Sequence, residues 1–182
     1  MSIPEISIII PTHNRAAQLI ALLDSLAAQT YPMHKAEVIV VADSCNDDTE
    51  AQVTRARVGK PFLLHYMQHT ARNPGTTRNV GAFAAQGAML LFIDDDMVAL
   101  PTFIQAHVDA QGDNRVVIGY SHCVLPQNPS RNQLDARLWW EQRFAEMQCP
   151  DHRFSYTDFF SGNVSMPTAL FRAVKGLSLI HI

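Results

Sequence analysis

Residues 88–96 constrain the fold of this chain more than any other stretch. They read Ala-Met-Leu-Leu-Phe-Ile-Asp-Asp-Asp, an apolar run followed directly by three carboxylates. The run has the length of a strand and no polar alternation, which is typical of a strand that is buried on both faces. Open α/β sheets bind ligands at the carboxyl ends of such strands. We therefore expect Asp94, Asp95 and Asp96 at a binding edge of a parallel sheet.

The three carboxylates repel one another unless a cation or ordered hydrogen-bond donors offset their charge. Oxygen ligands suit hard divalent cations. A solvated acidic turn is the alternative interpretation, and the buried strand before the turn makes it less favourable. The sequence therefore predicts a site for Mn²⁺ or Mg²⁺ at this turn.

The bulk properties exclude several classes of protein. The 182 residues suffice for one domain with a hydrophobic core. A net charge of −3 with scattered basic residues argues against a nucleic-acid partner. Cys45, Cys123 and Cys149 form no C-x-x-C pair, which argues against structural zinc and fits a reducing compartment. With neither a signal-peptide pattern nor a membrane-spanning run, we expect a cytoplasmic protein, and peripheral association with the inner face of the membrane stays open.

Strand and helix patterns alternate up to residue 93, which predicts an α/β sheet with parallel strands. Pro11 is expected to end the first strand, Thr12 or Asn14 to cap the first helix, and Asn73-Pro74-Gly75 to form a turn. The expected strands cover 6–10, 37–42, 61–67, 88–93 and 115–121, with a strand-like stretch at 159–166 that is broken at Gly162. The expected helices cover 15–29, 49–58, 77–86, 101–111, 134–147 and 167–174, the last with Pro167 in its first turn.

Polar turns at residues 12–15, 43–49 and 94–96 follow three of these strands. Because parallel strands open on the same edge, we expect His13, Asp43 and the acidic turn around one cleft. The glycine-rich phosphate motifs G-x-G-x-x-G and G-x-x-x-x-G-K are absent from the sequence. Phosphates are therefore expected to be held by a metal and by side chains such as Arg78.

Five segments, in this order, together resemble family 2 glycosyltransferases with the GT-A fold. They are Ile-Ile-Ile-Pro-Thr-His-Asn-Arg at 8–15, Gln-Thr-Tyr-Pro at 29–32, Glu-Val-Ile-Val-Val-Ala-Asp-Ser at 37–44, Thr-Arg-Asn-Val-Gly at 77–81 leading to Phe-Ile-Asp-Asp-Asp at 92–96, and Gly-Asn-Val-Ser-Met at 162–166. The resemblance implies a Rossmann-like GT-A sheet with helices on both faces. It also implies one domain over 1–176, with a nucleotide-sugar-binding half at 1–98 and the start of an acceptor half at 99–176.

The resemblance implies where a nucleotide-sugar donor, in particular a UDP-sugar, would bind. Asp43 would accept a hydrogen bond from the nucleobase, with uracil N3–H as the expected donor, and His13 would lie against the base in the turn that Pro11 opens. The alternatives are that His13 belongs to a capping turn and that Asp43 caps the next helix. Ala42 replaces the first of two acids that are common in that turn.

The resemblance assigns the acidic turn to the sugar and phosphates. Asp94 would lie near the ribose, with Asp95 beside it in the donor site, and Asp96 would ligate the metal on the diphosphate. Arg78 would lie by the phosphates, and the alternative is a surface cation.

On the acceptor side, the resemblance points to Gly162, Asn163 and Trp140, facing a glycan, a lipid or another hydroxyl acceptor. Trp139 and Trp140 are more often core and interface residues than a platform for a sugar, and this is the favoured alternative. His65 and His69 have metal-like spacing, but the local pattern of strand and loop argues against a zinc role.

The resemblance implies transfer with inversion, which needs a base for the acceptor proton. In the family that base usually follows a Gly-Phe-Asp segment, whereas this chain continues from Gly176 into an apolar tail at 177–182 and has no acid after Asp158. We therefore expect a truncated C-terminus and a chain that binds donor but transfers poorly. Two alternatives remain: a non-catalytic nucleotide-sugar-binding fragment, and a haloacid-dehalogenase-type phosphatase with Asp94 as nucleophile in a D-x-D-x-V pattern, although those enzymes carry it on their first strand.

Overall fold

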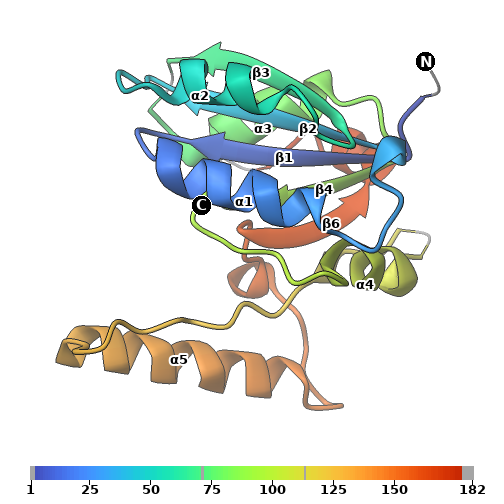
Figure 1. Ribbon diagram of the computed structural model, residues 1–182. Helices are drawn as coiled ribbons and strands as arrows, with labels where there is room; N and C mark the ends of the chain where they lie inside the picture. The colour runs from blue at the N-terminus through green and yellow to red at the C-terminus, as the bar shows by residue number, and fades with distance from the viewer. Residues whose placement is uncertain (1–2, 71, 113, 178–182) are drawn as a thin grey trace.

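The computed structural model describes residues 3–70, 72–112 and 114–177, and these residues form one six-stranded sheet with helices on both faces (Figure 1). The strand order is β3-β2-β1-β4-β6-β5. β3, β2, β1 and β4 are parallel, while β6 runs antiparallel to both of its neighbours. The strands are β1 (Ile6–Thr12), β2 (Ala36–Asp43), β3 (Leu63–His69), β4 (Met89–Ile93), β5 (Val117–Ile118) and β6 (Asn163–Pro167).

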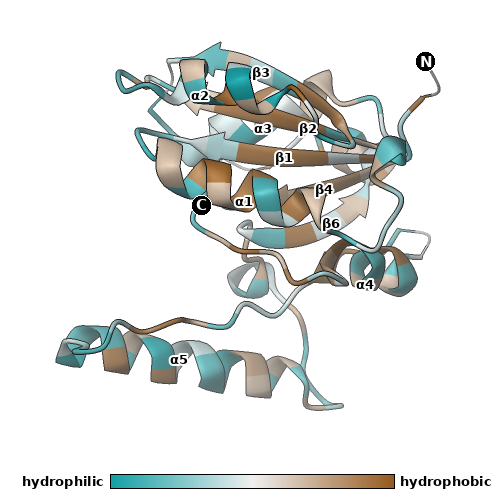
Figure 2. Cartoon of the chain, in the orientation of Figure 1, coloured by the Kyte–Doolittle hydropathy of each residue, from teal (hydrophilic) through white to brown (hydrophobic). Residues whose placement is uncertain are grey.

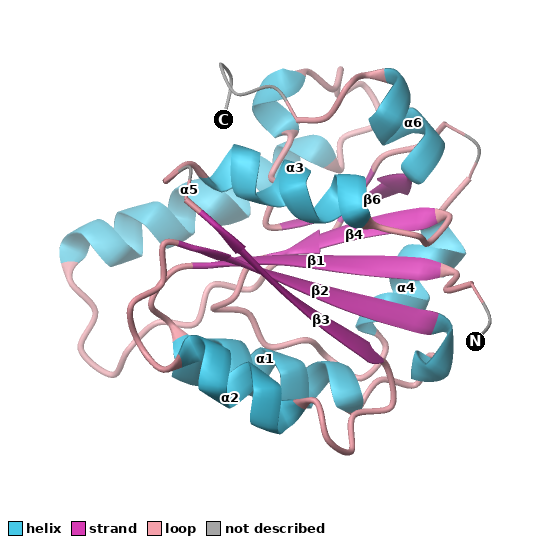
Figure 3. Cartoon of the chain, turned by 90° about the horizontal axis from the view of Figure 1, so that it is seen from above, coloured by secondary structure: helices cyan, strands magenta, loops and turns pink. Residues whose placement is uncertain are grey.

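The helices form two layers around this sheet. α1 and α2 cover one face, and α3 and α6 cover the other (Figure 3), whereas α5 stands apart from the sheet (Figure 1). The helices are α1 (Ala16–Ala27), α2 (Thr49–Ala56), α3 (Pro74–Ala84), α4 (Phe103–Ala110), α5 (Arg131–Met147) and α6 (Thr168–Ala173). Two short 3₁₀ turns cover Met33–Lys35 and Tyr156–Asp158.

The central strands are apolar through their middle parts (Figure 2), as expected for strands that are covered on both faces. Ile8 and Ile10 pack into the cluster that α1 covers, while Ile9 packs into the cluster beneath α3. This alternation follows from the two-residue period of a strand. The two-layer arrangement confirms the expected α/β fold with helices on both faces.

α3 lies very close to the sheet at Gly81. A β-carbon at this position would lie 2.8 Å from Ile9 Cγ2 and 2.9 Å from Val41 Cγ2, so a larger residue would push the helix away. This close approach sets the position of α3, and therefore of Arg78 one turn earlier, relative to the ends of β1 and β2.

The expectation that Pro11 ends the first strand is wrong, since β1 continues to Thr12. β4 pairs with β1 only as far as the Ile9–Phe92 pair, so the edge of β1 that faces β4 is already open at Pro11. A proline is tolerated there because no ladder donor is needed on that side.

The starts of α1 and α3 also differ from those expected from the sequence. Arg15 is the N-cap of α1 and makes no side-chain capping bond; instead, Asp47 Oδ2 accepts from the Ala16 N–H at 3.4 Å. Asn73-Pro74-Gly75 does not form a separate turn but begins α3, with the Asn73 side chain accepting from Thr76 N. Asparagine and proline favour helix starts as strongly as turns, so composition alone did not separate the two. Pro167 precedes α6 as its N-cap.

The strand expected over 115–121 shortens to Val117–Ile118. One further ladder-like bond runs from Gly119 N to Asn163 O. Beyond Gly119, side chains rather than a strand bind the backbone carbonyls. Asn163 Nδ2 donates to Tyr120 O, and Trp140 Nε1 donates to Ser121 O. Of the tail expected at 177–182, residues 178–182 lie outside the described residues. In the described part of the chain, no helix combines the length and apolar character that crossing a bilayer requires.

Candidate functional site

The turns that follow β1, β2 and β4 meet at one edge of the sheet, because these strands are parallel neighbours. Hydrogen bonds join the turns directly. Thr12 Oγ1 donates to Asp95 Oδ2 at 2.7 Å, and His13 Nδ1 lies 2.6 Å from Asp43 O. The structure thus brings the three polar turns into one site.

Each carboxylate of the acidic turn has a different environment. Asp94 forms an ion pair with Arg78. Asp95 and Asp96 share Arg15, whose Nη1 lies 3.2 Å from Asp95 Oδ1 and 2.9 Å from Asp96 Oδ2. The Asp94, Asp95 and Asp96 side chains are 35%, 6% and 51% exposed, so Asp96 is the one most open to a ligand.

Burial raises the pKa of Asp95 above its usual range, although the hydrogen bond from Thr12 and the charge of Arg15 act in the opposite direction. In turn, the negative charge of the nearby Asp95 is the main cause of a raised pKa of Arg15. Asp95 is therefore the buried carboxylate of the turn, and Thr12 and Arg15 fix its position.

Arg78 is buried beneath the site, at 5% exposure, and the alternative of a surface cation is wrong. One guanidinium nitrogen pairs with Asp94, while its Nε is buried and has no hydrogen-bond partner among the described residues. A buried cation of this kind needs an anion nearby, and Asp94 provides it.

Asp43 organises the segment between β3 and α3. Its Oδ1 accepts from Arg72 N at 2.9 Å and from Ser44 Oγ at 3.2 Å, while its Oδ2 accepts from Asn73 N and Thr77 Oγ1, both at 3.0 Å. Burial by itself would raise the pKa of Asp43, but these hydrogen bonds outweigh it and hold the pKa below the usual range. Asp43 therefore does not cap α2, the helix that follows its own strand, but fixes the start of α3.

The ring of His13 is exposed and held at a defined orientation. The Asp43 carbonyl can only accept, so Nδ1 carries the proton and donates to it. Nε2 then accepts from the Asn14 side-chain amide at 3.4 Å. The exposed face of an oriented aromatic ring can stack on a planar ligand.

Gly162 and Asn163 differ in how they meet the site. Gly162 O accepts from Asp94 N at 3.1 Å, so Gly162 touches the acidic turn directly. Asn163 is buried: its Oδ1 lies 2.9 Å from His107 Nε2, and its amide reaches Tyr120 and Ser121. Asn163 thus links β6, α4 and the end of β5 rather than facing open space.

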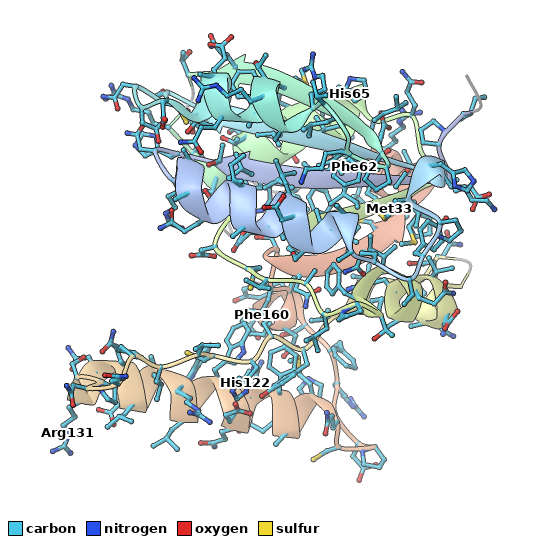
Figure 4. All side chains as sticks on the ribbon, in the orientation of Figure 1. Met33, Phe62, His65, His122, Arg131 and Phe160 are labelled. Carbon is cyan, nitrogen blue, oxygen red and sulfur yellow. The ribbon has the colours of Figure 1, made fainter. Side chains whose placement is uncertain are left out.

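Trp140 belongs to an aromatic cluster. Its ring centroid lies 4.6 Å from that of Phe160 and 5.0 Å from that of Phe144, and its N–H donates to Ser121 O at 2.7 Å. Phe160 lies between the sheet and α5 (Figure 4). Trp139, the residue before Trp140, is 57% exposed. Of the two tryptophans, Trp139 presents a ring that an acceptor could contact.

The acidic turn fits a divalent cation that is shared with phosphates. Among the described residues, His, Cys, Asp and Glu form no group of three or more that could hold a metal by itself. Mg²⁺ sites commonly use one or two carboxylates together with substrate phosphates. Asp96 is half-exposed, its Oδ2 lies 2.9 Å from Arg15 Nη1, and it offers such a carboxylate.

Sequence reasoning missed Arg15, Thr12 and Thr77 as parts of the site. All three lie in or next to turns that were singled out, but their roles depend on partners 34 to 83 residues away. A cation in the turn after the first strand, opposite three acids, was the available signal for Arg15.

A cavity of about 790 Å³ lies away from the acidic turn, within the later half of the chain. β5, α5 and the 154–159 segment line it, mainly with apolar side chains.

His65 lies 3.5 Å from the buried Glu37 and takes part in no metal-binding group of described residues.

Comparison with known proteins identifies the class to which this fold and site belong. Residues 7–174 match the sequence profile of glycosyl transferase family 2. The chain therefore belongs to this family of nucleotide-sugar transferases, and the expected resemblance is confirmed. The family assignment also removes the haloacid-dehalogenase alternative.

A curated relative is the validoxylamine A glucosyltransferase of Streptomyces hygroscopicus subsp. jinggangensis (strain 5008). The alignment with it spans 199 positions at 30% identity and covers 96% of this chain and 47% of the relative. The corresponding enzyme of Streptomyces hygroscopicus subsp. limoneus is 29% identical, with 44% of it covered. The chain thus spans about half the length of these relatives.

Two solved structures share the fold. The mannosyltransferase PcManGT from Pyrobaculum calidifontis, in complex with GDP-Man and Mn²⁺, superposes with a TM-score of 0.71 at 22% identity, covering 97% of this chain and 48% of that one. TarS 1–349 from S. aureus, in complex with UDP-GlcNAc, has a TM-score of 0.68 at 25% identity, covering 93% and 47%. The expected GT-A fold is confirmed.

Proposed function

We propose that this chain carries the donor-binding part of an inverting glycosyltransferase that moves a sugar from a UDP-sugar to an acceptor hydroxyl. The observation that carries this proposal is the meeting of three polar turns at the carboxyl edge of β1, β2 and β4. The family assignment, together with neighbours that bind UDP-GlcNAc or GDP-Man, supports the nucleotide-sugar donor. The donor-binding half is assigned to residues 1–98 and the acceptor half to 99–176.

The nucleobase lies between His13 and Asp43 in this proposal, at the turn that Pro11 opens. His13 offers its exposed ring for stacking. All four hydrogen bonds to the Asp43 carboxylate are made within the protein, so uracil N3–H takes the place of Ser44 Oγ, which makes the longest of them at 3.2 Å. Base binding therefore exchanges one hydrogen bond for another.

The diphosphate lies over the acidic turn. The buried Arg78 lies by the phosphates and pairs with Asp94, which lies near the ribose. Asp95 holds the turn together, and Asp96 ligates Mn²⁺ or Mg²⁺. Mn²⁺ in the PcManGT complex supports a divalent metal in this class of site. When bound, the cation neutralises charge on the leaving diphosphate.

Transfer requires that the acceptor oxygen attack the anomeric carbon and that its proton pass to a base. Two of the late acids, Asp158 and Glu141, are engaged by other side chains. Asp158 is buried and paired with Arg143 and His152, and Tyr120 Oη lies 2.7 and 2.8 Å from the two Glu141 oxygens, which share its one proton. Binding without efficient transfer by these 182 residues is therefore our second proposal.

Titration calorimetry with UDP, in the presence and absence of Mn²⁺, tests donor binding. We expect Mn²⁺ to strengthen UDP binding to the native chain, Asp96→Asn to remove that gain, and Asp135→Asn on the exposed face of α5 to keep it. A comparison with GDP tests the base preference. Equal UDP affinity with and without metal would contradict the proposed metal role.

A turnover assay on the same preparation separates transfer from binding. UDP release is measured with candidate acceptors supplied, and we expect it to be slow, because a positioned base contributes roughly 10²–10⁴-fold to such a step. Rapid release that depends on the acceptor would mean that a described or tail residue supplies the base, and would overturn the binding-only proposal.

A further inference from the structure

Arg15 occupies an unusual position for a cation. It is the N-cap of α1, yet its side chain makes no capping bond. Positive charge is unfavourable at a helix N-terminus, which already carries the positive end of the helix dipole. Helix stability therefore does not account for an arginine here, and its contacts with the acidic turn must.

The contacts of Arg15 are asymmetric. Nη1 bridges Asp95, whose side chain is 6% exposed and also bound by Thr12, and Asp96, whose side chain is 51% exposed. The Asp95 end is buried and anchored, while the Asp96 end faces solvent and can be released. Arg15 would therefore stay at the turn even after a ligand takes Asp96 from it.

The charges of the turn show what such a ligand would meet. Arg15 and Arg78 together offset two of the three carboxylates, so little negative charge is left to attract a free divalent cation. A cation arriving alone must displace Arg15 from Asp96 and then lie close to that guanidinium. A cation arriving with a diphosphate brings oxygen ligands and negative charge that offset both costs.

We propose that Arg15 is a positioning residue that makes metal binding at Asp96 depend on the donor nucleotide. In the free protein it holds Asp96 and keeps metal affinity low. When nucleotide is present, metal and diphosphate bind together, and Asp96 exchanges its guanidinium partner for the metal. This inference rests on the proposed function, in which Asp96 is the metal ligand.

The test is Mn²⁺ binding, measured by the loss of the free Mn²⁺ signal in electron paramagnetic resonance, with Mn²⁺ alone and with Mn²⁺ plus UDP. For the native chain we expect weak binding of Mn²⁺ alone and much tighter binding with UDP. Arg15→Gln should tighten the binding of Mn²⁺ alone by about tenfold, a usual size for coupling between sites. The gain on adding UDP should shrink by the same factor.

Two further variants sharpen the result. Arg15→Lys keeps the charge without the guanidinium fork and should fall between the native chain and Arg15→Gln. Arg131→Gln removes the same charge from the far end of α5 (Figure 4), where the side chain is 92% exposed, and should change neither measurement. Thermal unfolding of each variant checks that the fold is kept.

The outcomes separate the two proposals. If Arg15→Gln leaves the binding of Mn²⁺ alone unchanged or weaker, while Asp96→Asn abolishes Mn²⁺ binding with UDP, the role of Arg15 is wrong and the metal role of Asp96 stands. If the native chain binds no Mn²⁺ even with UDP, both are wrong.

Discussion

Gly162 faces the carboxylate of Asp94 with no room for a side chain between them. A β-carbon on Gly162 would lie 2.9 Å from Asp94 Cγ and closer still to one of its oxygens. At the same time, Gly162 O accepts from Asp94 N at 3.1 Å. The residue that directly precedes β6 therefore sets the position of the first acid of the turn that follows β4.

Gly162→Ala should accordingly disturb the donor site. The added methyl group must push Asp94 away from Arg78 or move the backbone, and overpacking of this kind costs about 1–3 kcal/mol. We expect a lower unfolding midpoint and weaker UDP binding, measured by thermal unfolding and calorimetry. The matched control is Gly112→Ala, where the nearest atom would be 3.5 Å away. UDP affinity equal to that of the native chain would show that Asp94 takes no part in binding.

Asp43→Asn tests the dual role of this carboxylate. An amide nitrogen cannot accept, so the substitution leaves two of the four donors around Asp43 without a partner. We expect a loss of about 1–3 kcal/mol in the free energy of unfolding, measured by chemical denaturation. If UDP affinity also falls when measured well below the unfolding midpoint, base recognition is supported; unchanged affinity would leave Asp43 as an organiser of α3 alone.

The dependence of stability on pH follows from the same groups. The pKa values of Asp43 and Asp158 are lowered by their hydrogen bonds and, for Asp158, by Arg143 and His152, in each case against burial. Their contributions are present above the pKa of an unfolded aspartate, about 3.9, and are lost as the pH falls through the folded-state values. Asp95 acts in the opposite sense, because burial raises its pKa.

We therefore expect the free energy of unfolding to fall as the pH is lowered from 5 towards 2, measured by denaturant titration at each pH. Asp158→Asn should flatten this fall. A steeper fall in the variant than in the native chain would contradict the assignment of Asp158 as a stabilising, ionised group.

Glu37 offers a prediction that does not depend on function. It is buried on β2, at the opposite edge of the sheet from the acidic turn, and its Oε1 accepts from Ser7 Oγ and Gln86 N. Glu37→Ala leaves both donors unpaired and should cost about 2–4 kcal/mol, whereas Glu37→Gln keeps the acceptor and should cost under about 1 kcal/mol. Equal losses in chemical denaturation would show that the negative charge, not the acceptor, is what matters.

Much of the fold could be predicted from local patterns. The apolar run before Asp94 identified a strand covered on both faces, and the leucines of residues 19–26 identified the helix that covers one of them. Such patterns depend on residues that are near neighbours in the chain, and the burial of an alternating or continuous apolar surface decides them. The same reasoning placed the three polar turns at one edge, because parallel strands share a direction.

Only the tertiary structure decided which partners those turns would find. Arg15 meets Asp95 and Asp96 across 80 and 81 residues, and Asp43 meets the backbone of Arg72 and Asn73 across 29 and 30. The sequence alone determined the residue types and the edge at which they gather. The pairing depended on the final packing of α1, α3 and β6 against the sheet, because hydrogen bonds and ion pairs form only where separate elements bring their groups within about 3 Å of one another.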